Sequence, residues 1–167
     1  MKVRQAARVV LLNEAGDVFL LRVSDLYDPA SHRWMTCGGG ADLGESPLQT
    51  AARELAEETG LECDPCALIG PIAEHTVLIE YSDRSFHQHE VFYGLRIDED
   101  LDLDDAVWTD TEKKTIDQWR WWPRSELDST GETVYPARLG ELVDLVHRGE
   151  TPAVPLDLGD SLHDLRR

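Results

Sequence analysis

The sequence predicts an α/β fold, in which an α/β/α sandwich surrounds a mixed central sheet. Three observations support this: apolar strand-like segments come in two pairs, a well-capped amphipathic helix lies between the pairs, and a second amphipathic helix follows them. A chain of 167 residues without an internal repeat favours one domain. We expect residues 1–151 to form this domain and residues 152–167, with two prolines, to form a tail.

The elements before the central helix are short. Residues 4–12 and 17–23 are apolar segments around a Glu14-Ala15-Gly16 turn, which predicts a hairpin. Residues 24–37 are polar and predict a loop that leads into the glycine run at residues 38–40.

The central helix is the best-specified element. Ser46 suits the N-cap and Pro47 the first helical position, Gln49 can complete a capping box, and Gly60 supplies a left-handed stop. We therefore expect a helix over residues 47–59. Its apolar stripe consists of Leu48, Ala51, Ala52, Leu55 and Thr59.

The elements after the helix complete the sandwich. Residues 67–81 and 85–97 predict a second long hairpin, and residues 98–105 an acidic solvated connection. Residues 115–123 predict a strand in which Trp119 and Trp121 share a face; such aromatics favour packing, and the alternative is a stacking wall for a nucleobase. Residues 138–147 predict the second helix.

Three glutamates on the central helix, Glu54, Glu57 and Glu58, fall outside its apolar stripe and share one face. Their i,i+3 and i,i+4 spacings each cost roughly 0.2–0.5 kcal/mol of helix stability. One interpretation is a solvated acidic face, helped by an i,i+4 pair between Arg53 and Glu57. The other is a Mg²⁺ site, because this cation prefers oxygen ligands and shares its shell with substrate phosphates. The preceding glycine-rich turns favour the metal site.

Residues 39–61 resemble the Nudix box, G-x5-E-x7-R-E-U-x-E-E-x-G-U with U aliphatic, and match it at every specified position. Seven fixed identities at these spacings arise by chance about once in a billion starts. The resemblance implies a Nudix-type α/β/α sandwich and an enzyme that hydrolyses a diphosphate linkage in a nucleoside diphosphate joined to another group. The box does not identify that group.

The resemblance also implies the metal site. Glu57 and Glu58 would be the principal Mg²⁺ ligands, and Glu54 with the carbonyl region of Gly39 would complete the environment; Mn²⁺ is an alternative ion. Arg53 would orient the glutamates by ion pairing. The remaining acid of the box, at position 45, is expected to support the helix.

The box does not identify the carboxylate that takes the proton of the attacking water. Glu54 is one candidate. Glu112 is another, in a segment (residues 108–114) expected to be a loop before the 115–123 strand, and Glu90 is the third. The alternative for Glu90 and Glu112 is an ordinary exposed acid.

The composition limits the kinds of partner that the protein is expected to bind. A net charge of −17 argues against a nucleic-acid surface, which needs clustered lysine and arginine. No apolar run is long enough for a membrane span, and residues 9–12 are too short for a signal segment. We therefore expect a cytoplasmic enzyme with a small-molecule nucleotide substrate; a homodimer is compatible with the sequence.

Two alternatives concern the function. A Nudix-fold sensor would bind a nucleotide without hydrolysing it. A protein that only binds a nucleotide, however, does not need the complete set of metal-site residues that this sequence contains. Cys37 occupies a position where many Nudix hydrolases have proline, which suggests isopentenyl-diphosphate isomerase as an alternative activity. Gly40, however, occupies the position where that enzyme needs a metal-binding histidine.

Cys63 and Cys66 have the spacing of zinc ligands, but the sequence has no second pair of ligands. We therefore expect these cysteines to have no functional role, with a redox pair as the alternative.

The sequence does not select a substrate. Downstream markers associated with ADP-ribose and dinucleoside polyphosphate hydrolases are absent, because Val77 occupies the expected place and Tyr81 comes a few residues late. A nucleoside triphosphate or a nucleotide sugar is the default.

Overall fold

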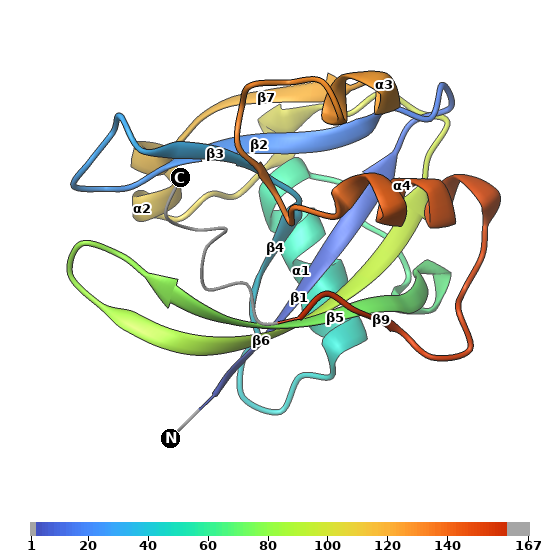
Figure 1. The fold of residues 1–167 in the computed structure, drawn as a ribbon, viewed down its shortest axis with the longest axis horizontal. Helices are drawn as coiled ribbons and strands as arrows, with labels where there is room; N and C mark the ends of the chain where they lie inside the picture. The colour runs from blue at the N-terminus through green and yellow to red at the C-terminus, as the bar shows by residue number, and fades with distance from the viewer. Residues whose placement is uncertain (1–2, 160–167) are drawn as a thin grey trace.

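The structure is a computed structural model that describes residues 3–159. Figure 1 shows a curled sheet with helices on both sides. The strands are β1 (Arg4–Leu12), β2 (Val18–Ser24), β3 (His32–Met35), β4 (Cys37–Gly40), β5 (Ile69–Glu80), β6 (Ser85–Arg96), β7 (Ile116–Trp122), β8 (Val134–Tyr135) and β9 (Leu156–Asp157). The helices are α1 (Pro47–Thr59), α2 (Asp110–Thr115), α3 (Arg124–Leu127) and α4 (Leu139–Arg148), with short 3₁₀ turns at Pro65–Ala67 and Leu103–Asp105.

Two hydrophobic cores, one on each face of the sheet, confirm the expected α/β/α sandwich. Strand β1 supplies both, because its side chains alternate between the faces. Ala7 and Val9 pack with α1, whereas Val10 and Leu12 pack with α4. The helices contribute Ala51, Ala52 and Leu55 from α1 and Leu139, Leu142, Val143 and Val146 from α4.

The sheet is mixed and forks at β1. Its order is β8-β3-β2-β1-β6-β5-β9, and β1 runs parallel to β6 but antiparallel to β2 and β4. The predicted hairpin of residues 4–12 and 17–23 is reduced to one register pair, Leu12 with Val18. Strand β2 then leaves β1 to pair with β3 and β7, and β4 takes its place beside residues 6–9 of β1.

Two segments expected to be loops are ordered elements. Residues 24–37 contain β3 and the start of β4, because Trp34 is buried and β3 pairs with β2. Residues 108–114 contain most of α2, which begins with a capping box in which Thr109 and Glu112 exchange backbone–side-chain bonds. The Thr-x-x-Glu spacing signals such a box in the sequence, so this helix was predictable.

The other expected elements are confirmed, and α1 has the predicted bounds and both predicted caps. The rings of Trp119 and Trp121 lie 5.7 and 5.3 Å from that of Phe19, which confirms that they pack on the sheet. Within residues 152–159, β9 pairs with β5, and residues 160–167 lie outside the described part; the division at residue 151 stays a prediction. Among the described residues, no helix is long and apolar enough to cross a membrane.

Candidate active site

Helix α1 and strand β4 enclose two of the predicted metal ligands. Glu54 and Glu58 are only 8% and 6% exposed, although they lie outside the apolar stripe of α1. Strand β4 covers them: the backbone N–H of Gly38 donates to Glu58 Oε2 at 2.8 Å. A Cβ at Gly39 would lie 2.6 Å from the carboxyl carbon of Glu54, so only glycine permits this approach. The solvated-face interpretation is therefore wrong for these two glutamates.

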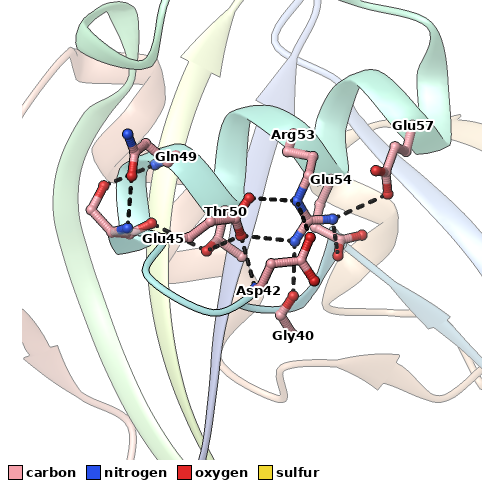
Figure 2. A network of polar contacts seen from close by, with 9 residues as sticks. Gly40, Asp42, Glu45, Gln49, Thr50, Arg53, Glu54 and Glu57 are labelled. Atoms are coloured by element: carbon pink, nitrogen blue, oxygen red, sulfur yellow. Dashed lines mark hydrogen bonds and ion pairs between the residues drawn. The ribbon is translucent and has the colours of Figure 1, made fainter.

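Arg53 holds the acidic groups around α1 together (Figure 2). Its guanidinium donates to both carboxylate oxygens of Glu45 at 2.7 and 3.0 Å, to Glu54 at 2.9 Å and to Glu57 at 3.2 Å. It also donates to the carbonyl of Gly40 at 2.9 Å, which ties α1 to β4. The pKa of Glu45 is lowered to about 2, chiefly by its hydrogen bonds from Arg53. This geometry agrees with a supporting role for Glu45.

A third carboxylate reaches the site from a distant part of the chain. The backbone N–H of Val107 donates to Glu57 O at 2.7 Å, and Trp108 Nε1 donates to Glu58 O at 3.0 Å. These bonds satisfy carbonyls of the last turn of α1 and fix the start of α2 beside it. Carboxylate oxygens of Glu54, Glu58 and Glu112 consequently lie within 4.8 Å of one another. The structure thus brings the half-buried Glu112 to the predicted site.

The three carboxylates form a site that suits a hard cation. Burial raises the pKa of Glu58 well above its usual range, and the charge of Glu54 adds to this effect. The pKa of Glu54 is also raised, chiefly by burial, although Arg53 opposes the shift. Two buried carboxylates beside a third offer the oxygen ligands that Mg²⁺ and Mn²⁺ prefer. The donor set therefore fits a divalent ion.

Glu57 stands apart from this group. Its side chain is 42% exposed and pairs with Arg53, as the i,i+4 spacing predicted. Because the three grouped carboxylates do not include Glu57, its predicted role as a principal ligand stays a prediction.

A cleft of about 460 Å³ opens beside the carboxylates, a volume in the range of small-molecule sites. Glu58, Glu112 and Gly39 line it, together with side chains from β1, β2 and β3. A second hollow, of about 350 Å³, borders another face of α1, and none of the three grouped carboxylates reaches it. The first cleft is therefore the candidate substrate site.

Glu90, the third candidate base, is fully buried, so the expectation of an exposed acid is wrong. It forms an ion pair of 2.7 Å with Arg8 and accepts further hydrogen bonds from Gln88 and Tyr135. Burial alone would raise its pKa, but Arg8 and these donors outweigh burial and lower it. A carboxylate so occupied has no access to a water in the cleft. Sequence reasoning missed Arg8, although one arginine inside an apolar strand was a usable signal.

Cys37 is fully buried, and burial, together with the nearby charge of Glu58, raises its pKa. The thiol is therefore neutral at physiological pH and a poor nucleophile, which argues against the isomerase chemistry. Cys63 and Cys66 are free thiols.

We expect Arg53→Lys to lower the free energy of unfolding of the metal-free protein by about 2 kcal/mol, because lysine cannot reproduce the guanidinium fork. The pKa of Glu45 should then rise from about 2 toward its usual value. Thermal unfolding and NMR titration of the glutamate side chains measure both effects. Arg138→Lys, at an exposed pair with Glu141, is the matched control and should change stability by less than about 0.5 kcal/mol. Equal losses in the two variants would contradict this account.

Comparisons with known proteins agree with the site. The family model described as NUDIX domain matches residues 2–143. An RNA pyrophosphohydrolase from Rhizobium meliloti (strain 1021) is 29% identical over 136 residues, which cover 74% of this chain and 81% of that protein. An RNA pyrophosphohydrolase from Bartonella quintana (strain Toulouse) is 45% identical over 62 residues, but these cover only 35% of this chain and 36% of that protein.

Among solved structures, the crystal structure of the MutT protein from Methanosarcina mazei Go1 has a TM-score of 0.60 and 21% identity, and the match covers 87% of this chain and 94% of that one. This likeness shows the shared fold. The family model spans most of the chain and includes the segment that carries the buried Glu54 and Glu58. The chain therefore belongs to the Nudix family, whose hydrolases cleave diphosphate linkages.

Proposed function

We propose that the protein is a Mg²⁺-dependent pyrophosphohydrolase of nucleotide derivatives. The observation that carries this proposal is the convergence of Glu54, Glu58 and Glu112 beside one cleft, where two of the three are buried and burial raises the pKa of both. Buried carboxylates of this kind lower the stability of the free protein, so their presence in one group supports a ligand that compensates them.

Each residue has a distinct part in the proposed reaction. Glu54 and Glu58 would hold the metal, with Glu57 and the Gly39 carbonyl as further ligands, and Glu112 lies within reach of a water bound there. When bound, the ion would neutralise phosphate charge and lower the pKa of a water. Arg53 keeps the glutamates oriented through its hydrogen bonds and ion pairs (Figure 2).

We assign the general base to Glu112. Its side chain is half-buried and lines the cleft, whereas the carboxylate of Glu54 is engaged by Arg53. One oxygen of Glu112 accepts the N–H of Thr109 at 2.7 Å, which fixes the carboxylate at the start of α2. A fixed and accessible carboxylate suits the removal of a proton from water.

The substrate class we propose is a nucleoside 5′-polyphosphate. Two similar bacterial proteins are named RNA pyrophosphohydrolase, so we extend the proposed class to RNA that carries a 5′-polyphosphate. The net charge of −17 disfavours extensive contact with an RNA backbone, so recognition should be confined to the first nucleotides.

A panel of nucleoside triphosphates, nucleotide sugars, dinucleoside polyphosphates and 5′-triphosphorylated oligonucleotides, with Mg²⁺ or Mn²⁺, tests the proposal when products are resolved by chromatography. We expect metal-dependent release of phosphate, pyrophosphate or nucleoside monophosphate from at least one member, and its loss with EDTA. Glu112→Gln should lower kcat by about 10²- to 10⁴-fold and leave KM almost unchanged. Nucleotide binding without any turnover would favour the sensor instead.

A further inference from the structure

The cleft contains arginines that lack acidic partners. Within residues 3–159, four arginines make no ion pair, namely Arg4, Arg33, Arg84 and Arg96, whereas the other arginines each do. Three of these four line the cleft. The chain has 33 acidic residues against 16 lysines and arginines, so partners for every arginine are abundant. Unpaired arginines gathered in one cleft therefore indicate an anionic ligand.

Arg33 is the most enclosed of the three. The side chains of β3 alternate, so that Trp34 packs in the core beneath α4 while Arg33 and Met35 line the cleft. Arg33 is half-buried, and no hydrogen bond to its guanidinium occurs among the described residues. Its pKa is lowered, chiefly because burial removes water from the charge and also because Arg8 lies nearby.

The charge of Asp25 acts on Arg33 without neutralising it. The carboxylate of Asp25 forms no ion pair with it and instead accepts the N–H groups of Tyr27 and Asp28 and the hydroxyl of Ser82. These bonds hold the 25–31 loop against the turn between β5 and β6, the two segments that border the cleft mouth. The guanidinium of Arg33 is thus partly desolvated, and its donors are available to a ligand.

We propose that Arg33 binds a phosphate group of the substrate that lies outside the scissile diphosphate. This inference rests on the proposed function, because it places the scissile diphosphate at Glu54, Glu58 and Glu112. A guanidinium fork matches two phosphate oxygens, and the partial burial of the site strengthens the attraction. Arg84, whose guanidinium lies 5.2 Å from the ring centre of Tyr81, adds positive charge at the rim.

Two substrates offer the same chemistry. One is a nucleoside triphosphate, in which the additional phosphate is part of the polyphosphate tail. The other is a 5′-triphosphorylated oligonucleotide, in which it is the phosphodiester after the first nucleoside. ADP, ATP and the dinucleotide pppApA distinguish the two substrates. ATP differs from ADP by the additional tail phosphate, and pppApA differs from ATP by the phosphodiester after the first nucleoside.

The experiment compares wild type with Arg33→Gln and Arg33→Lys. Arg22→Gln is the matched control, because Arg22 also lies on the sheet but points away from the cleft and pairs with Asp117 at 2.7 Å. Calorimetry with methylene-bridged ADP and ATP gives dissociation constants without turnover, and kcat/KM is measured for ADP, ATP and pppApA. Thermal unfolding verifies that each variant is folded.

We expect Arg33→Gln to weaken binding of methylene-bridged ATP, or to lower kcat/KM for pppApA, by about 10- to 100-fold, with ADP and its analogue unaffected. Arg33→Lys should fall between wild type and Arg33→Gln, and Arg22→Gln should match wild type. A loss with ATP supports the tail phosphate, whereas a loss confined to pppApA supports the phosphodiester.

Equal effects on all ligands, or no effect on any, would overturn the subsite and leave the proposed function intact as long as the wild type turns over. If no substrate is hydrolysed but binding of methylene-bridged ATP depends on Arg33, the proposed enzyme is refuted and Arg33 is only a phosphate-binding residue of a nucleotide sensor. The two failures are therefore distinguishable.

Discussion

Glu58→Gln is expected to lower Mg²⁺-dependent hydrolysis by about 10³-fold or more, the largest effect on activity that the structure predicts. Glutamine keeps the shape of the side chain and still accepts the Gly38 N–H that bonds Glu58 at 2.8 Å. What it removes is one of the three carboxylate charges that lie within 4.8 Å of one another. Steady-state kinetics together with calorimetric titration of Mn²⁺ measure the loss of turnover and of metal binding.

The same variant should not lose stability. Burial and the charge of Glu54 raise the pKa of Glu58, so its ionised form opposes folding at neutral pH when no metal is bound. Glutamine removes this penalty, and the unfolding temperature of the metal-free variant should equal or exceed that of wild type. Glu62→Gln, an exposed glutamate just after α1, is the control and should leave activity unchanged. Full activity in Glu58→Gln, or a folding defect that explains its inactivity, would refute the assignment.

Glu57→Gln, in the same assay, tests the ligand that the structure leaves outside the carboxylate group. We expect it to abolish turnover as well, because the resemblance assigns Glu57 to the metal. Activity near the wild-type level would instead restrict Glu57 to its ion pair with Arg53 at 3.2 Å.

Arg8→Met should produce the largest loss of stability. Arg8 and Glu90 form an ion pair at 2.7 Å, with their side chains only 7% and 0% exposed. Removal of the arginine leaves a buried carboxylate without its counter-ion, which costs about 3–5 kcal/mol. For a chain of this size the unfolding temperature should fall by roughly 6–20 °C. The double variant Arg8→Met/Glu90→Leu should recover part of the loss, because it removes the unpaired charge as well.

The loss in Arg8→Met should depend on pH. In wild type the pKa of Glu90 is lowered, so its contribution to stability is complete above the unfolded-state pKa of about 4.3 and disappears as the pH falls through the folded value. In the variant, burial is no longer opposed by Arg8 and raises the pKa of Glu90, so protonation at acidic pH relieves the penalty. The difference in unfolding temperature should therefore be largest at neutral pH and shrink toward pH 4. A difference that is constant with pH would show that lost packing, not charge, is responsible.

Helix α1 and the Nudix box could be predicted from the sequence because they depend on local interactions. The hydrogen bonds that cap the helix join Ser46 to Gln49 and Gly60 to Ala56, partners only three or four residues apart. The pairing of Arg53 with Glu57 follows from the same helical spacing. Such interactions are determined by the order of neighbouring residues, and the strands with clear apolar alternation were readable for the same reason.

The prediction of a loop for residues 24–37 was wrong because strand pairing is not a local property. Strand β3 is short, and its backbone pairs with β2, across the 25–31 loop, and with β8, which is distant in the sequence. The prediction of a hairpin for residues 4–12 and 17–23 was wrong because β1 pairs with β2 at only one register position and pairs with β4 instead over residues 6–9. Pairing of this kind depends on partners that the local pattern does not specify.

The sequence by itself determined the family motif, the capped glutamate helix and the sandwich, because each depends on residues that are close along the chain or on simple periodicity. Only the tertiary structure decided which acids form the site: β4 buries Glu54 and Glu58, and the bond from Trp108 to the end of α1 brings Glu112 to them. It likewise paired Glu90 with Arg8 and left Arg33 unpaired in the cleft. Burial and ion pairing depend on distances in space, which strand register and sheet curvature determine after the chain has folded.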